Sequence, residues 1–190
     1  MKKITLLIAI ALLGFNSSVF SQNKFLNTLK AIIDAMTEEK YQVANVITET
    51  VTVNSTSNAT LSGGKSRGAF KFTLPDGTKK FAIRVTVIPV KSNFQYVDDE
   101  SFISLIKKGS GKEVAAPQNN GINFFFFDRS YDADAFVGKN NFNYLWNIVN
   151  TNSFIQSRPI NPGNYWIGIQ NPSSVYGLKA ICEVVAFGTF

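Results

Sequence analysis

Carboxylates are the residues of this sequence whose type and spacing come nearest to a catalytic or metal-binding pattern. The sequence contains no histidine, which excludes a catalytic triad or a zinc site built on that residue. Asp128, Asp132 and Asp134 lie close together in a segment that we predict to be a loop. Two carboxylates could act on a glycosidic bond and three could hold Ca²⁺, although the glycine and the closing glutamate of a calcium loop are missing. We favour the alternative, a solvated loop in which these aspartates make local turns.

The remaining acids have simpler explanations. Asp98 to Glu100 would begin a short helix that Lys107 and Lys108 end, and this order of charges complements the helix dipole. Glu183 stands alone in a predicted strand. A carboxylate that catalyses at neutral pH needs a raised pKa, which requires burial or a like-charged neighbour. We therefore predict no catalytic residue, no cofactor and no metal, and the three loop aspartates are the one calcium candidate.

Aromatic side chains are the second group of residues in this sequence that could bind a ligand. Trp166, Trp146, Tyr144 and Tyr176 could stack on sugar rings and are our candidate ligand-binding residues. Trp166 and Gly168 fall on the same side of a predicted strand, which would leave a shelf beside the indole ring. We favour the alternative, in which these aromatic residues belong to the hydrophobic core or to an aromatic belt, as most do.

Residues 24–36 are predicted to form an amphipathic helix. Apolar side chains recur there at spacings of three and four residues: Phe25, Leu26, Leu29, Ile32, Ile33 and Met36. So wide an apolar face must be covered. We favour the domain's own sheet as the cover, and a partner protein is the alternative.

From Val46 onward the apolar residues recur every second position and β-branched residues become frequent, which is typical of strands. Residues 70–74 and 81–87 alternate in this way on either side of Pro75-Asp76-Gly77-Thr78, a turn sequence, and we predict a hairpin. Residues 122–127 are apolar on both faces, which predicts a central strand covered on both sides and favours a helix packed on the outer face of a sheet.

The last predicted strand runs from Leu178 to Phe187. One of its faces carries a continuous set of small and apolar residues: Leu178, Ala180, Cys182, Val184 and Ala186. Cys182 is the single cysteine of the chain, so an internal disulfide is excluded. We expect Cys182 to be a buried, free thiol.

The first residues have the pattern of a secretory signal peptide. Lys2 and Lys3 supply the positive start, and residues 4–13 form an apolar run that is too short to span a bilayer. A suitable cleavage site follows Ser21, so the mature chain would start at Gln22. A retained anchor helix is the alternative. We therefore expect a secreted or periplasmic protein with no transmembrane segment after signal removal.

Length and charge indicate one domain and an ordinary surface. Beyond the signal peptide at 1–21, we divide the chain into an amphipathic helical segment at 22–45 and a β-sandwich domain at 46–190. Loss of Lys2 and Lys3 lowers the formal net charge from +6 to +4. The remaining excess of lysine and arginine is spread along the chain, whereas a nucleic-acid-binding protein would gather it on one face. We expect no nucleic-acid partner.

The closing segment carries a resemblance. Gly163 to Asn171, followed by the alternating residues 178–186, resembles the closing hairpin of secreted bacterial pre-peptidase C-terminal domains and, more loosely, of GOLD-like β-sandwiches. The resemblance covers about a third of the chain. It implies a non-catalytic accessory domain and carries over no catalytic residue. This chain departs from the family in its amphipathic helix and in the absence of an attached protease domain.

These observations predict a mainly β fold, an antiparallel β-sandwich of jelly-roll or immunoglobulin-like topology. An N-terminal amphipathic helix and one short internal helix would complete it. The function that we predict is extracytoplasmic binding of a protein or a glycan, without catalysis. A carboxylate-based polysaccharide hydrolase is the first alternative, and a structural component of a surface or matrix is the second.

Overall fold

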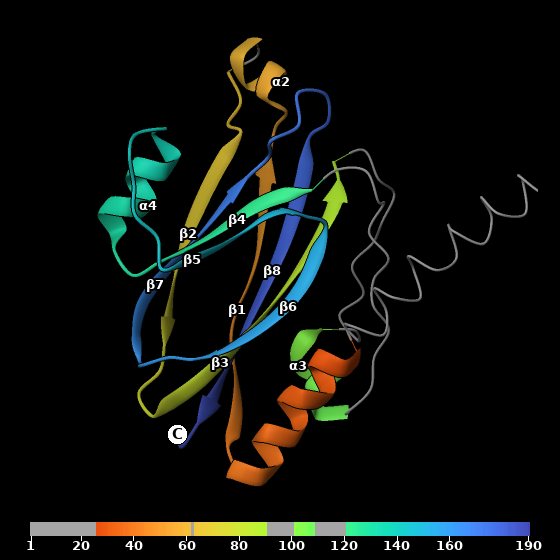
Figure 1. The fold of residues 1–190 in the computed structure, drawn as a ribbon, viewed down its shortest axis with the longest axis vertical. Coiled ribbons are helices and arrows are strands. Elements are labelled where there is room, and N and C mark those ends of the chain that lie inside the picture. Colours follow the sequence, from red (N-terminus) through yellow and green to blue (C-terminus); the bar gives the residue numbers. More distant parts are fainter. Residues whose placement is uncertain (1–25, 62, 91–100, 109–120) are drawn as a thin grey trace, which may run out of the picture.

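The computed structural model describes residues 26–61, 63–90, 101–108 and 121–190 (Figure 1). The predicted signal peptide at 1–21 and the acids Asp98 to Glu100 lie outside these residues. Two four-stranded antiparallel sheets pack face to face, which confirms the predicted β-sandwich. The first sheet has, in spatial order, β1 (Gln42–Val53), β8 (Leu178–Gly188), β3 (Thr78–Pro89) and β6 (Ser153–Pro159). The second has β2 (Arg67–Leu74), β7 (Gly163–Gln170), β4 (Ile122–Phe127) and β5 (Trp146–Thr151).

The main core lies between the two sheets. Side chains alternate between the faces of a strand, so one face of every strand contributes to this core. The predicted inner face of β8 is confirmed, because Leu178, Ala180, Cys182, Val184 and Ala186 all belong to it. Phe126 lies near its centre, with its ring 5.2 Å from that of Phe81 and 5.8 Å from that of Phe72. Strands from both sheets therefore meet on a few large aromatic side chains.

The predicted hairpin at Pro75 to Thr78 is wrong. The turn forms, with the N–H of Thr78 donating to the carbonyl oxygen of Pro75 (3.2 Å) and Gly77 at a φ of +85°. It nevertheless connects β2 of one sheet to β3 of the other, so β2 pairs with β7 while β3 pairs with β8 and β6. Two amphipathic strands bury the same side chains whether the strands pair within one sheet or face each other from two sheets across the core. The alternation of apolar residues therefore does not distinguish a hairpin from a connection between sheets.

The closing hairpin implied by the family resemblance is corrected for the same reason. Both of its strands form, as β7 and β8, but they belong to opposite sheets. The chain crosses between the sheets through the loop that follows Asn171, whose side-chain amide donates to the carbonyl oxygens of Val53 (3.3 Å) and Tyr176 (2.6 Å). These hydrogen bonds tie the loop to the end of β1.

The prediction that β4 is a central strand with apolar side chains on both faces is confirmed. Phe124 and Phe126 face the main core, whereas Phe125 and Phe127 face outward under helix α4 (Ser130–Val137). This helix lies in the segment predicted to be a loop, so that prediction is wrong. Its buried residues include Ala133 and Phe136, and Phe136 packs on the outward side chains of β4. Asp132 and Asp134 lie within this helix and Asp128 precedes it.

The first described helix, residues 26–39, covers the outer face of the other sheet (Figure 1). Leu29 and Ile32 are buried against Val185 and Phe187 of β8, which confirms that the domain's own sheet covers part of the apolar face. The predicted helix α3 (Phe102–Lys108) joins the same cluster through Phe102, Leu105 and Ile106. A further short helix, α2 (Thr56–Leu61), was not predicted, and β1 begins at Gln42, four residues before the predicted start of the strands. No helix among the described residues is both long and apolar enough to cross a membrane.

The thiol of Cys182 should react with a thiol reagent only after denaturation. Cys182 is fully buried and free, and this burial raises the pKa of its thiol well above the ordinary value. The reactive thiolate is therefore scarce in the folded protein as well as shielded. Labelling by a chromogenic disulfide reagent, followed with and without denaturant, checks this expectation. Rapid labelling of the native protein would contradict the inward orientation of this side chain.

Candidate functional site

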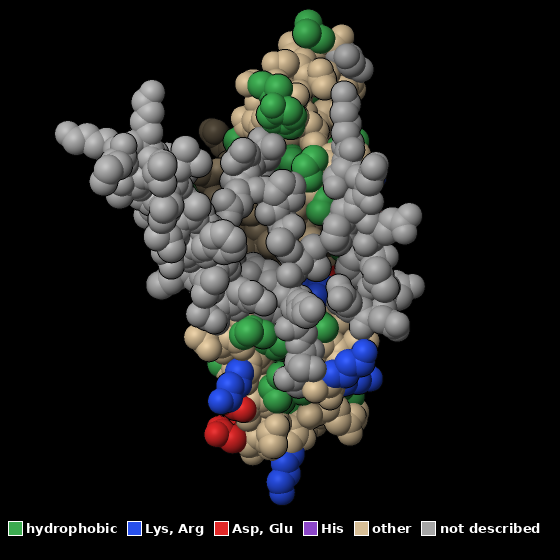
Figure 2. Space-filling view, turned by 90° about the vertical axis from the view of Figure 1, so that its right-hand side faces the viewer, with side chains coloured by type: hydrophobic (Ala, Val, Ile, Leu, Met, Phe, Trp, Pro, Cys, Tyr) green, Lys and Arg blue, Asp and Glu red, His purple; other side chains and the backbone are tan. Residues whose placement is uncertain are grey.

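A groove runs between helix 26–39 and the edge strand β6, with a volume of about 550 Å³. Figure 2 views the molecule from the side on which this helix lies. Helix residues that face the groove include Thr28, Ala31 and Ala35, and β6 lines it along its whole length. Strand β5 adds Ile148 and its last residue, Thr151. The groove therefore follows the edge of the first sheet and reaches the edge of the second. We call it the helix–strand groove.

Helical spacing explains why the groove stays open. Leu29 and Ile32 point to the sheet and hold the helix against β8. Thr28, Ala31 and Ala35 are three and four residues apart, so they form a neighbouring stripe that faces β6 instead. Because these side chains are small, the helix is anchored on the sheet without filling the space beside the strand.

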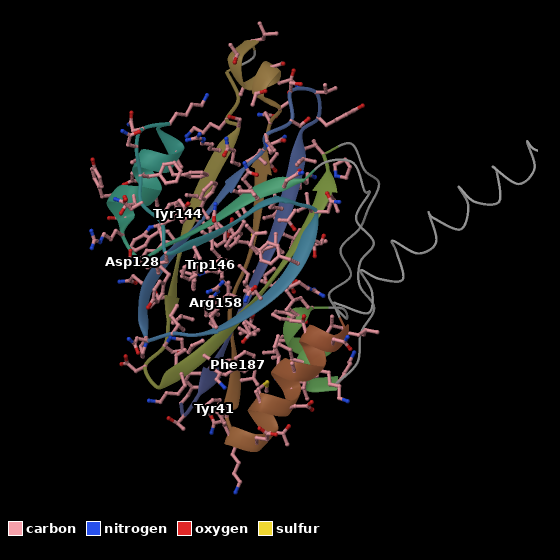
Figure 3. All side chains as sticks on the ribbon, in the orientation of Figure 1. Tyr41, Asp128, Tyr144, Trp146, Arg158 and Phe187 are labelled. Carbon is pink, nitrogen blue, oxygen red and sulfur yellow. The ribbon has the colours of Figure 1, made fainter. Side chains whose placement is uncertain are left out.

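The rim of the helix–strand groove carries charge at the end where β6 finishes. The Nζ of Lys80 lies 2.6 Å from Oε1 of Glu39 and 5.8 Å from the centre of the Tyr41 ring. Hydrogen bonds from Lys80 and then Tyr41 lower the pKa of the Glu39 carboxyl, and the bond to Glu39 raises the pKa of the Tyr41 phenol. Arg158 lies over the Trp146 ring, with its guanidinium carbon 4.8 Å from the ring centre, and it makes no ion pair within the described part of the chain. Figure 3 shows Tyr41 and Phe187 at this end and Trp146 beside Arg158.

The four predicted ligand-binding aromatics lie in three places. Trp166 and Tyr144 are both on the outer face of the second sheet: Trp166 packs against the outer cluster that contains Phe125, and the ring of Tyr144 lies 5.6 Å from that of Phe125. Trp146 faces the main core, where it stacks on Phe124 and Phe126 at ring distances of 4.9 and 5.2 Å. Tyr176 is 56% exposed in the loop between β7 and β8. The structure thus brings Trp166 and Tyr144 to one face, and Trp146 to the edge beside Arg158.

The predicted shelf beside Trp166 is filled. A Cβ atom at Gly168 would lie 2.7 Å from the Phe127 ring and 2.8 Å from the Phe136 ring. The missing side chain of Gly168 therefore makes room for helix α4 and its phenylalanine, which the sequence pattern did not predict. Trp166 itself is half-buried, with the Nζ of Lys71 5.7 Å from the centre of its ring.

The three loop aspartates do not converge. Asp128 and Asp134 are exposed, whereas Asp132 is buried and its Oδ1 accepts the backbone N–H of Asn143 (2.8 Å). Among the described residues, no group of three or more acidic, histidine or cysteine side chains is placed to hold a metal ion. This hydrogen bond holds the segment after helix α4 against the helix, so the carboxylate of Asp132 has a structural role.

Sequence reasoning missed a buried ion pair. Arg84 and Glu183 are 3% and 1% exposed and face each other on β3 and β8, with Nε of Arg84 2.5 Å from Oε2 of Glu183. The second carboxylate oxygen accepts the backbone N–H of Phe102 at the start of α3 (2.7 Å). A single arginine within the apolar strand FAIRVTVIP was the available signal. No pattern in the sequence indicated the helix–strand groove, because the groove depends on where helix 26–39 lies relative to the edge strand β6.

No family model matches the sequence, and a search of curated proteins finds none that matches. Among solved structures, the chain is similar to the pre-peptidase C-terminal domain of a collagenase from Bacillus anthracis, with 10% identity and a TM-score of 0.37 over 72% of this chain and 86% of that one. It is also similar to a periplasmic inhibitor of g-type lysozyme from Aeromonas hydrophila, with 9% identity and a TM-score of 0.33 over 78% of this chain and 89% of that one. A third structure is the C-terminal carbohydrate-binding module of a marine laminarinase from Zobellia galactanivorans, with 11% identity and a TM-score of 0.35 over 78% of this chain and 94% of that one.

The first of these structures belongs to the family that the closing segment of the sequence resembles. The predicted resemblance is thus found again when structures are compared. Identities and TM-scores of this size carry no ligand and no activity over to this chain.

Proposed function

We propose that this chain is a non-catalytic, extracytoplasmic binding domain and that the helix–strand groove is its binding site. The observation that supports this proposal is an open groove of about 550 Å³ whose floor includes Ile32 and Phe187 and whose rim carries Lys80 and Arg158. An apolar floor with a few polar groups at its rim is the usual form of a ligand site. The partner is a protein or a glycan.

The chemistry of the groove suits binding better than catalysis. No aspartate or glutamate is among the described residues that line it. The nearby carboxyl of Glu39 is exposed and hydrogen-bonded to Lys80, which lowers its pKa and makes it a poor proton donor at neutral pH. The alternative of a polysaccharide hydrolase rests on Asp128, Asp132 and Asp134, whose arrangement offers it no support.

The extracytoplasmic location is part of the proposal and rests on the sequence. Lys2, Lys3 and the apolar run at 4–13 form the expected signal peptide, and cleavage after Ser21 would release the domain. The intact mass of the exported protein tests this: we expect a chain that begins at Gln22. A mature form that still contains residues 1–21 would show a retained anchor instead.

Blocking the groove should abolish binding. Ala31 lines the groove and is exposed, so Ala31→Trp should fill it without disturbing the packing of Leu29 and Ile32. Lys30→Trp is the matched control, because Lys30 is exposed on the same helix and is not among the lining residues. The mature protein is screened against polysaccharides and envelope proteins for retention and for product release. We expect retention without turnover, lost in Ala31→Trp and kept in Lys30→Trp.

Two other results would redirect the proposal. Retention of a polysaccharide that survives Ala31→Trp but is lost in Trp166→Ala would place the site on the outer face that Trp166 and Tyr144 share. Product release that disappears in Asp132→Asn, in a variant that melts like the parent, would establish the hydrolase.

A further inference from the structure

One edge of β6 has no partner strand among the described residues. The strand pairs with β3 over seven residues without a register shift. Just beyond it, the N–H of Ile160 donates to the carbonyl oxygen of Lys79 (3.1 Å). Hydrogen-bonded pairs alternate along an antiparallel ladder, so the backbone groups of Phe154, Gln156 and Arg158 face β3. The N–H and C=O groups of the residues between them, Ser153, Ile155 and Ser157, consequently point away from β3.

This edge lacks the features that usually block strand addition. Natural edges are protected by bulges, charged side chains or proline. The opposite edge of the same sheet, β1, has an irregular register between Asn45 and Ile47 and carries the exposed Glu49. Strand β6 is regular and uncharged from Ser153 to Ser157, and its only charge and only proline come at its end.

The helix–strand groove follows the open edge of β6, and all seven residues of the strand line it. Neighbouring strands lie about 4.8 Å apart, so an added strand needs a clear channel on that side. The small side chains of Ala31 and Ala35 keep the helix side of the channel open. An added strand would therefore point alternate side chains toward these alanines and toward Ile148 of β5.

From this geometry we propose that the ligand of the groove is an extended polypeptide segment of a partner protein, which pairs with β6 as an additional strand of the sheet. The inference rests on the proposed function and deepens it. Backbone donors and acceptors at strand spacing match a peptide backbone, and β-strand addition is an established mode of peptide recognition. Arg158, which has no ion pair within the described part of the chain, lines the groove near the end of β6 and selects an acidic residue at that end of the segment.

The probe is a displayed library of random ten-residue peptides, selected on the mature protein and counter-selected on Ala31→Trp. Enriched sequences are synthesised with and without N-methyl groups on alternate residues, which removes one edge of backbone donors while keeping every side chain. We expect enriched peptides that alternate apolar and polar residues and carry an acidic residue near one end. Methylation on the pairing edge should weaken binding at least about tenfold, because several hydrogen bonds are lost together.

Two measurements on the protein side give the inference its sharpest test. Ser157→Pro removes one donor on the free edge, where proline is tolerated, and Ser157→Ala is its matched control. Both variants lose the bond from the Ser157 hydroxyl to the carbonyl oxygen of Phe81 (3.0 Å), so the loss of that bond cancels in the comparison. Ser157→Pro should weaken peptide binding about tenfold relative to Ser157→Ala. In hydrogen exchange on the unmodified protein, we expect the amides of Ile155 and Ser157 to exchange rapidly in the free protein and to be protected when peptide is bound.

The outcomes separate this inference from the proposed function. Enriched peptides that bind equally well when methylated on either edge, or that leave the amides of Ile155 and Ser157 unprotected, would overturn strand addition. A selection that enriches no peptide would also overturn strand addition. If the protein then retains a polysaccharide that Ala31→Trp does not bind, the groove remains the binding site. If Ala31→Trp excludes nothing that the protein binds, the proposed function itself fails. The methylation and exchange arms use the unmodified protein, so they decide the matter even if Ser157→Pro does not fold.

Discussion

Replacing Glu183 by alanine should lower the free energy of unfolding by about 3 to 5 kcal/mol. The change leaves the buried guanidinium of Arg84 without the carboxylate that lies 2.5 Å from it. It also removes the acceptor of the Phe102 N–H at the start of α3. A buried charge or donor that loses its partner pays its desolvation cost without compensation. Urea unfolding of parent and variant measures the difference.

The matched control replaces both members of the pair. Arg84→Met with Glu183→Leu in one chain keeps the volume apolar and removes both charges, and such exchanges are often neutral or stabilising. We expect this double variant to recover most of the loss, apart from the unpaired N–H of Phe102. A Glu183→Ala variant as stable as the parent would show that water reaches the pair, contrary to the burial of both side chains.

Replacing Leu29 by aspartate should lower the free energy of unfolding by about 2 to 4 kcal/mol. Leu29 is 2% exposed and packs with Ile32 against Val185 and Phe187. The variant loses that burial and places a carboxylate in an apolar site. Asn27→Asp, at an exposed position of the same helix, adds the same single negative charge and controls for it. Thermal and urea unfolding of the three proteins provide the measurement.

A different result would change the role of helix 26–39. If Leu29→Asp melts like the parent but no longer binds a partner or itself, the apolar face of the helix is an interface between molecules. The helix–strand groove would then lose its outer wall in the free protein. This experiment therefore also tests a premise of the proposed binding site.

Much of the fold could be predicted from local patterns. The alternation in residues 178–187 identified the buried face of β8, including Cys182, because a strand has two faces and one of them must meet the core. The double-sided apolar run at 122–127 identified β4 as a central strand that is covered on both faces, although not the helix that covers its outer face. These predictions succeeded because each depends on residues that are neighbours in the sequence.

The candidate site could be predicted only in small part. Trp146 was named as a ligand-binding candidate and lies against Arg158 at the rim of the groove. Its role in binding stays a prediction, as do those of Trp166, Tyr144 and Tyr176. The groove itself was not foreseen, because Ala31 and Ala35 are unremarkable in sequence and matter only where the helix lies beside β6.

By itself, the sequence determined the buried faces of β4, β8 and helix 26–39, the absence of histidine chemistry and the absence of an internal disulfide. Only the tertiary structure decided that the turn at Pro75 to Thr78 joins two sheets, that Arg84 meets Glu183, and that one edge of β6 has no partner strand among the described residues. The physical reason is common to all three. A strand's residue pattern records how much of each face is buried, but it does not record which other strand or helix, distant in the sequence, buries it.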